Sequence, residues 1–275
     1  MYHYVGEGGM KGLSVDEFKQ QLEYLQNNYT IVDLYTYLDN LPSVSKMCVL
    51  TFDDGLKCHY TKVFPILKDM GLTASFFIIT QPLLEHKINS VHKIHLLLSK
   101  FGDDLINEFD VQGVNIEDAR KVYYYENDKR ALLKFYLNFH LPESKRDEQV
   151  REVFKKHFSE SIAKKFYLSF GEIKKMSEAM TIGSHTHTHS DFSKLTKEEI
   201  KNTLMQSKRI LEKFVPNIDA FSYPFGGKNV VSDRTTEVLK GLGFKCALTT
   251  IKGDNTENPD LFMLKRYDTI DLAVP

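Results

Sequence analysis

The sequence has few cysteines, almost no net charge and no long apolar run. Its three cysteines are odd in number and widely spaced, which argues against a disulfide framework and favours a reducing compartment. The formal net charge of -1 supplies no field that would attract nucleic acid or an anionic membrane. No apolar run approaches the ~20 residues that span a bilayer, and no signal-peptide leader precedes the first motif, so we expect a cytoplasmic protein with no integral membrane segment.

The chain is long enough for a large core, with 275 residues of which 42% are apolar. Its pattern alternates strand signals with helix signals. Capping boxes that begin at Ser14, Ser169 and Thr196 predict the starts of three helices. This alternation predicts an α/β fold with a parallel sheet, and the number of strands favours a distorted (β/α) barrel over a short open sheet. The predicted strands cover residues 29–32, 47–52, 74–79, 181–184, 220–223 and 245–249.

Residues 82 to about 168 break this alternation with helical patterns alone. We therefore expect a single domain over residues 1–275 that carries a helical insertion at about 82–168. The insertion either pads one end of the barrel or acts as a substrate lid. Its aromatic run Tyr123-Tyr124-Tyr125 could stack on sugar faces, but packing of the insertion explains the run equally well.

Two adjacent carboxylates, Asp53 and Asp54, follow the predicted strand at 47–52 and precede Gly55. Taken alone, the triplet is most simply an Asx-type turn with both acids in solvent. A strand that ends at a glycine turn can instead direct both side chains into one pocket. Their charges then repel unless a divalent metal lies beside one and a cation or water beside the other.

Three histidines follow the predicted strand at 181–184, and packing alone explains them poorly. Imidazoles suit a borderline divalent ion such as zinc, and His185 and His189, four residues apart, reach one centre from a helical turn or a tight loop. Together with Asp54 they would form a site with open coordination positions. His187 is ambiguous, since an extended strand would place all three histidines on one face.

A rigid turn, Pro224-Phe225-Gly226, follows the predicted strand at 220–223. Such a turn can direct backbone N–H groups into a pocket, as in an oxyanion hole.

These three motifs, in this order, resemble those of the polysaccharide deacetylase family, also called the NodB-homology domain or carbohydrate esterase family four. Residues 51–55 match its first motif, His185, Thr186 and His189 match its His-Ser/Thr-x-x-His motif, and Pro224-Phe225-Gly226 matches the core of its third. The resemblance covers about residues 47–250 and leaves the insertion out.

The resemblance implies a catalytic metal held by Asp54, His185 and His189, with zinc expected and cobalt or nickel as alternatives. It makes Asp53 the general base that activates the attacking water. The backbone N–H of Phe225 then helps to hold the developing oxyanion.

The sequence departs from the family pattern at two places. No arginine precedes Pro224 in the third motif, so another cation must tune Asp53, and Arg266 is the candidate. No histidine follows His189, so the family's C-terminal Leu-x-His motif, source of the general acid, is absent. The N-terminal segment Met1-Tyr2-His3-Tyr4-Val5 is similar to that of a circularly permuted branch, the biofilm poly-N-acetylglucosamine deacetylases. That likeness gives the acid's role to His3.

The sequence thus predicts a metal-dependent amide hydrolase that removes an acyl group, with acetyl expected, from an amino sugar. A cytoplasmic location favours a nucleotide-linked, lipid-linked or short glycan intermediate as the substrate. Two alternatives stay open at this point: a hydrolase of another small amide such as a formamide, and a sugar-binding protein that has lost catalysis. The oligomeric state is not predicted.

Overall fold

The computed structural model describes residues 1–227 and 230–272, which divide into two compact units. Unit 1 comprises Met1–Gly8, Gly12–His86 and Lys164–Pro275, and unit 2 comprises Gly9–Lys11 and Lys87–Ala163. Whether the chain is one domain with an insertion stays a prediction. Across the described residues, no helix combines the length and the apolar character needed to cross a bilayer.

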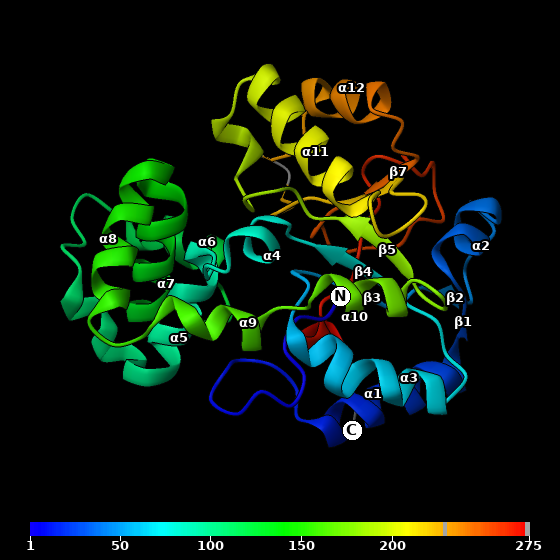
Figure 1. The fold of residues 1–275 in the computed structure, drawn as a ribbon, viewed down its shortest axis with the longest axis horizontal. Helices are drawn as coiled ribbons and strands as arrows, with labels where there is room; N and C mark the ends of the chain where they lie inside the picture. The colour runs from blue at the N-terminus through cyan, green and yellow to red at the C-terminus, as the bar shows by residue number, and fades with distance from the viewer. Residues whose placement is uncertain (228–229, 273–275) are drawn as a thin grey trace. The chain divides into compact units, whose positions relative to one another are not determined.

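A five-stranded parallel sheet in unit 1 curls into a half-barrel (Figure 1), which confirms the predicted α/β class and distorted barrel. Its strands, in spatial order, are β3 (Thr51–Phe52), β4 (Ser75–Ile78), β5 (Thr181–Ser184), β6 (Ala220–Ser222) and β7 (Cys246–Leu248). A separate parallel pair joins β1 (Thr30–Ile31) to β2 (Met47–Cys48).

The apolar run at residues 47–52 belongs to two sheets, whereas the sequence predicted one strand. Its first two residues pair with β1, and Thr51 and Phe52 pair with β4. The same extended segment therefore serves two partner strands in succession, a non-local arrangement that hydrophobic periodicity does not reveal.

Segments near both ends of the chain extend the two edges of the half-barrel. Tyr2 forms a parallel bridge with Phe52, and Leu264 forms one with Leu248. The two added segments meet where the amino group of Met1 donates to the carbonyl oxygen of Tyr267 at 2.7 Å. These segments are too short to give a strand signal of their own in the sequence.

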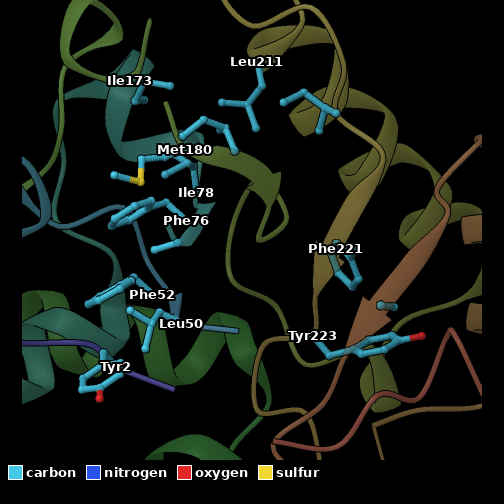
Figure 2. Close-up of a cluster of buried hydrophobic side chains, with 14 of the residues drawn as sticks. Tyr2, Leu50, Phe52, Phe76, Ile78, Ile173, Met180, Leu211, Phe221 and Tyr223 are labelled. Carbon is cyan, nitrogen blue, oxygen red and sulfur yellow. The ribbon is translucent and has the colours of Figure 1, made fainter. Parts of the chain in front are cut away.

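Alternation along the strands separates an inner core from an outer one. The inner core includes Phe77, Ala220, Cys246 and Leu248. In the outer core, the rings of Tyr2 and Phe52 stack at 5.0 Å and those of Phe52 and Phe76 at 4.8 Å. Figure 2 shows Phe52 between Tyr2 and Phe76. Since Thr51 and Asp53 flank Phe52 in the sequence, their side chains point to the inner side.

Helices of unit 1 surround the sheet, and α10 and α11 both contact β5 (Figure 1). The predicted capping boxes at Ser14, Ser169 and Thr196 are all formed, so these helix starts are confirmed. The α-helices are α1 (Val15–Asn28), α2 (Leu34–Asp39), α3 (Phe64–Asp69), α4 (Gln81–Glu85), α10 (Phe170–Met176), α11 (Lys197–Leu211) and α12 (Asp233–Gly241). A π-helical turn, His59–Val63, leads into α3.

Unit 2 is helical, and within it α5 contacts α8 and α6 contacts α7. Tyr123 is buried among Ala119 and Ala131 and accepts a hydrogen bond from Asn138, whereas Tyr124 is exposed. Packing therefore explains the first tyrosine of the aromatic run. The helices are α5 (Ser90–Phe101), α6 (Ile116–Val122), α7 (Asp128–Phe135) and α8 (Glu143–Lys155), and α9 (Ala163–Phe166) lies at the boundary with unit 1.

Replacement of Ile173, a fully buried residue of α10 in the outer core, should strongly destabilise the protein. We expect Ile173→Ala to lower the free energy of unfolding by about 2–5 kcal/mol, because it removes buried methyl groups and leaves a cavity. Ile270→Ala is the matched control, since Ile270 is 52% exposed and should change the value by less than about 0.5 kcal/mol. Urea unfolding followed by circular dichroism measures both, and equal losses would contradict this account of the core.

Candidate active site

The predicted site residues gather at one edge of the half-barrel. Parallel strands all end at the same edge, so the loops that follow them converge. Asp53 and Asp54 follow β3, His185 follows β5, and Phe225 follows β6. Arg266 follows the segment that pairs with β7 through Leu264.

Asp54, His185 and His189 form a buried group that could hold a metal ion. The Nε2 atoms of His185 and His189 lie 3.4 and 3.5 Å from Asp54 Oδ1. Ligand atoms ~2.0–2.1 Å from a tetrahedral zinc ion lie about 3.4 Å apart, so these separations suit such an ion. One carboxylate and two imidazoles leave a position open for water or substrate.

The backbone in the loops that carry Asp54 and His189 adopts conformations that few residues tolerate. Asp54 has φ 81°, Thr186 has 66° and His189 has 59°, all in the left-handed region. The Thr186 hydroxyl accepts a hydrogen bond from the His189 backbone N–H at 2.8 Å, which fixes the turn. Gly55 has φ 70°, and a Cβ there would lie 3.0 Å from the Ile78 side chain, so glycine is needed.

A backbone carbonyl sets the tautomer of His185. Its Nδ1 donates to the carbonyl oxygen of Ser222 at 2.7 Å, which leaves Nε2 as the acceptor that faces Asp54. Burial opposes a charge on this imidazole, but the carboxylates of Asp53 and Asp54 outweigh burial and raise its pKa.

His187 lies outside the metal-ligand group. Its Nδ1 lies 2.9 Å from the Thr80 hydroxyl, and its Nε2 accepts from the Gln206 amide at 2.9 Å. Burial lowers the pKa of this imidazole. The alternative in which all three histidines share one face is therefore wrong, because the loop turns sharply after His185.

Arg266 binds Asp53 in a buried bidentate ion pair. Its Nη1 donates to Oδ1 at 3.0 Å, and its Nη2 donates to Oδ2 at 2.8 Å. The Nε of Arg266 donates to the Thr249 carbonyl at 2.7 Å, which ties the guanidinium to the end of β7. The structure thus brings the candidate cation to the carboxylate across 213 residues of sequence.

The pKa of Asp53 reflects two opposed effects. Burial would raise the pKa of this carboxyl, but the guanidinium of Arg266, with lesser contributions from His185 and His3, holds it well below the usual range. Asp53 therefore stays ionised at neutral pH, even though its exposed fraction is only 2%.

Ser222 is a site residue that the sequence reasoning missed. Its hydroxyl accepts from Arg266 at 2.9 Å and donates to Asp53 Oδ2 at 3.1 Å, while its carbonyl oxygen holds His185. One feature of the sequence could have indicated Ser222: it is a serine between two aromatic residues in a buried strand, at the place where the family usually carries its arginine.

His3 and Phe225 lie at the margin of the group. His3 Nε2 is 4.0 Å from Asp54 Oδ2, and its side chain is 36% exposed, far more than those of Asp54, His185 and His189. Phe225 has φ 59°, and its ring meets that of His189 at 5.0 Å. The oxyanion role of the Phe225 N–H stays a prediction.

A sequence profile of the polysaccharide deacetylase family matches residues 41–118 and 169–247, which is more than half of the chain. A Bacillus subtilis (strain 168) protein, YxkH, carries the name of a polysaccharide deacetylase and is 29% identical over 122 residues. That match spans 42% of this chain and only 39% of YxkH. His3 and Arg266 both lie outside the residues that the profile matches.

Two solved structures have a similar fold. The Streptococcus pyogenes deacetylase PplD, in complex with acetate, has a TM-score of 0.60 and 18% identity, with 97% of this chain and 88% of that chain covered. IcaB from Ammonifex degensii has a TM-score of 0.58 and 18% identity, with 96% and 88% covered. At this identity the likeness establishes the fold alone.

Removal of the guanidinium should destabilise the protein in a pH-dependent way. We expect Arg266→Met to lower the free energy of unfolding at pH 7 by about 3–5 kcal/mol, because Asp53 is left buried without its partner. A depressed carboxyl pKa stabilises the fold above the unfolded pKa of about 4, and this contribution is lost as the pH falls. The difference in the free energy of unfolding between Arg266→Met and the wild type should therefore become smaller below about pH 4.

Arg151→Met is the matched control, because Arg151 pairs with Glu152 on the surface. Its effect should stay below about 1 kcal/mol at every pH. Urea unfolding at several pH values measures both variants. A loss for Arg266→Met that is the same at pH 7 and pH 3 would show that Arg266 acts by packing and not by charge.

Proposed function

The chain belongs to the polysaccharide deacetylase family, and from this premise we propose that it hydrolyses the N-acyl group of an amino sugar. Acetyl is the acyl group we expect, and the sugar is carried by a glycan or by a lipid-linked or nucleotide-linked intermediate. One observation carries the proposal: a buried Asp-His-His group lies directly beside an ionised Asp53. That pairing supplies a metal site and a base for the attack of water on an amide.

A divalent ion held by Asp54, His185 and His189 would polarise the acyl carbonyl and make the attacking water more acidic. We propose zinc, with cobalt or nickel as alternatives, because the donor set is one carboxylate and two imidazoles. The buried, tautomer-fixed His185 is suited to such an ion, since its Nε2 lone pair faces Asp54.

Asp53 accepts the proton of the attacking water in this proposal. Its Oδ2 already accepts from Arg266 and Ser222, whereas, among the described residues, Oδ1 accepts from Arg266 alone. A carboxylate oxygen has two lone pairs, so one on Oδ1 is left for the proton. The depressed pKa makes Asp53 a weak base, which is why it needs a water that has been made more acidic.

His3 donates a proton to the leaving nitrogen, and the backbone N–H of Phe225 donates to the oxyanion. His3 suits this role because its side chain is 36% exposed and its Nε2 lies 4.0 Å from Asp54 Oδ2. The products are a free amine and a carboxylic acid.

The ion pair of Arg266 with Asp53 weakens the sugar-binding alternative. Loss of the arginine from the third motif had favoured that alternative, but Arg266 supplies the missing cation.

Metal content should depend on the three proposed ligands. Purified protein loaded with zinc should hold one ion per chain, and Asp54→Ala and His189→Ala should bind it at least about 100-fold more weakly, because each removes a ligand atom. His187→Ala is the matched control and should keep the ion, since His187 bonds Thr80 and Gln206 instead. Calorimetric titration measures the affinities, and equal binding by the His187 and His189 variants would refute this ligand set.

Amine release tests the activity itself. N-acetylated and N-formylated nucleotide sugars and chitooligosaccharides are incubated with protein and added zinc, cobalt or nickel, and the free amine is quantified. Asp53→Asn should lower kcat by about 10²–10⁴-fold, with unchanged metal content, because it removes a base but no ligand. Release confined to the formylated substrates would favour the formamide alternative, and binding of sugars without any release would favour the sugar-binding one.

A further inference from the structure

A second histidine, His59, contacts the main chain of His3 and has no part in the chemistry described so far. It is fully buried at the start of the π-helical turn His59–Val63, shortly after the two aspartates. Its Nε2 lies 2.8 Å from the main-chain carbonyl oxygen of His3. The contact joins the loop after β3 to the N-terminal segment on the edge of the half-barrel.

The ring of His59 packs against two aromatic rings. Its ring meets that of Phe52 at 5.4 Å and that of Phe76 at 5.6 Å. Among the described residues, its Nδ1 has no hydrogen-bond partner. Burial of an imidazole among aromatic rings costs free energy unless its polar atoms are used, and here the His3 carbonyl uses one of them.

The hydrogen bond has a defined direction. Burial lowers the pKa of His59 to about 4, so the ring is neutral at neutral pH. A neutral imidazole bears one N–H, and in the part of the chain that the structure describes only Nε2 lies within hydrogen-bond distance of an acceptor. His59 therefore donates from Nε2, and the His3 carbonyl accepts.

The backbone at His3 needs such a partner because the strand ladder ends there. Tyr2 is held on both sides of its peptide unit: its N–H donates to Thr51 at 2.8 Å, and its carbonyl accepts from Asp53 at 3.1 Å. Asp54, two residues beyond the end of β3, has φ 81° and takes the backbone away from the ladder. Beyond that point the hydrogen bond from His59 takes the place of the ladder hydrogen bonds. The Cys58 thiol adds a weaker contact to the same His3 carbonyl oxygen, at 3.9 Å.

We propose that His59 is a positioning residue that anchors the main chain of His3 and so aims its imidazole at the leaving nitrogen. This inference rests on the proposed function, because it gives His59 its importance through the acid step. The His3 side chain is more than a third exposed, so its orientation depends on the main chain that carries it. Small misplacements of a catalytic group reduce rates strongly.

The test compares His59→Met with His59→Gln, two side chains of similar length of which only glutamine keeps an N–H donor. For an N-acetylated substrate that the wild type turns over, His59→Met should lower kcat by about 10–100-fold, with KM and metal content unchanged. His59→Gln should recover most of that loss. His59→Phe, which keeps an aromatic ring but no donor, should behave as His59→Met does.

A second substrate separates positioning from general damage to the fold. Hydrolysis of 4-nitrophenyl acetate expels a phenolate that needs no proton, so the acid step is unnecessary. His59→Met should therefore hydrolyse this ester within about twofold of the wild-type rate. An equal loss on ester and amide, or no difference between the Met and Gln variants, would overturn the inference.

His3→Ala distinguishes failure of the inference from failure of the acid step on which it rests, and absence of amide turnover by the wild type would refute the proposed function itself. If His3→Ala keeps full amide turnover, then His3 is not the acid, and both the acid step and the role of His59 fall. If His3→Ala loses turnover but His59→Met does not, only the inference falls. In the His3→Ala background, His59→Met should have no further effect on kcat.

Discussion

The ion pair between Asp53 and Arg266 is the interaction on which the rest of the site depends. Two adjacent carboxylates, each almost fully buried, would repel strongly in a medium of low dielectric constant. Arg266 neutralises Asp53 through two hydrogen bonds, whereas Asp54 lies beside the imidazoles of His185 and His189. The two acids therefore differ in their surroundings, although they are neighbours in the sequence.

The same pair also connects the two edges of the sheet. Asp53 follows the first strand of the half-barrel, and Arg266 follows the segment that pairs with the last strand. Ser222, on the fourth strand, bonds both residues and holds His185 with its carbonyl oxygen. Charge balance at the site thus requires that the sheet curls, because a flat sheet would hold these residues apart.

Local signals predicted much of this fold. The buried strands β4 and β5 and the capped helices α1, α10 and α11 are short-range patterns, and each is found close to its predicted position. What the sequence missed is non-local. The division of the run at residues 47–52 between two sheets and the bridge of Tyr2 with Phe52 depend on which strands become neighbours. Ser222 and His59 were missed for the same reason, since their partners are distant in the sequence.

The left-handed backbone at Asp54 and His189 has a consequence for the evolution of the site. Aspartate and histidine are among the few residues besides glycine that adopt positive φ readily, so these positions are constrained both by donor chemistry and by backbone conformation. Thr186 is a β-branched residue at φ 66°, and its hydrogen bond with the His189 N–H offsets the energetic cost of this backbone conformation. Exchange of one ligand type for another would have to satisfy both constraints at once. At positions 54 and 189, donors for the proposed metal are therefore confined to residues that tolerate positive φ, chiefly aspartate, asparagine and histidine, unless the loop itself is remodelled.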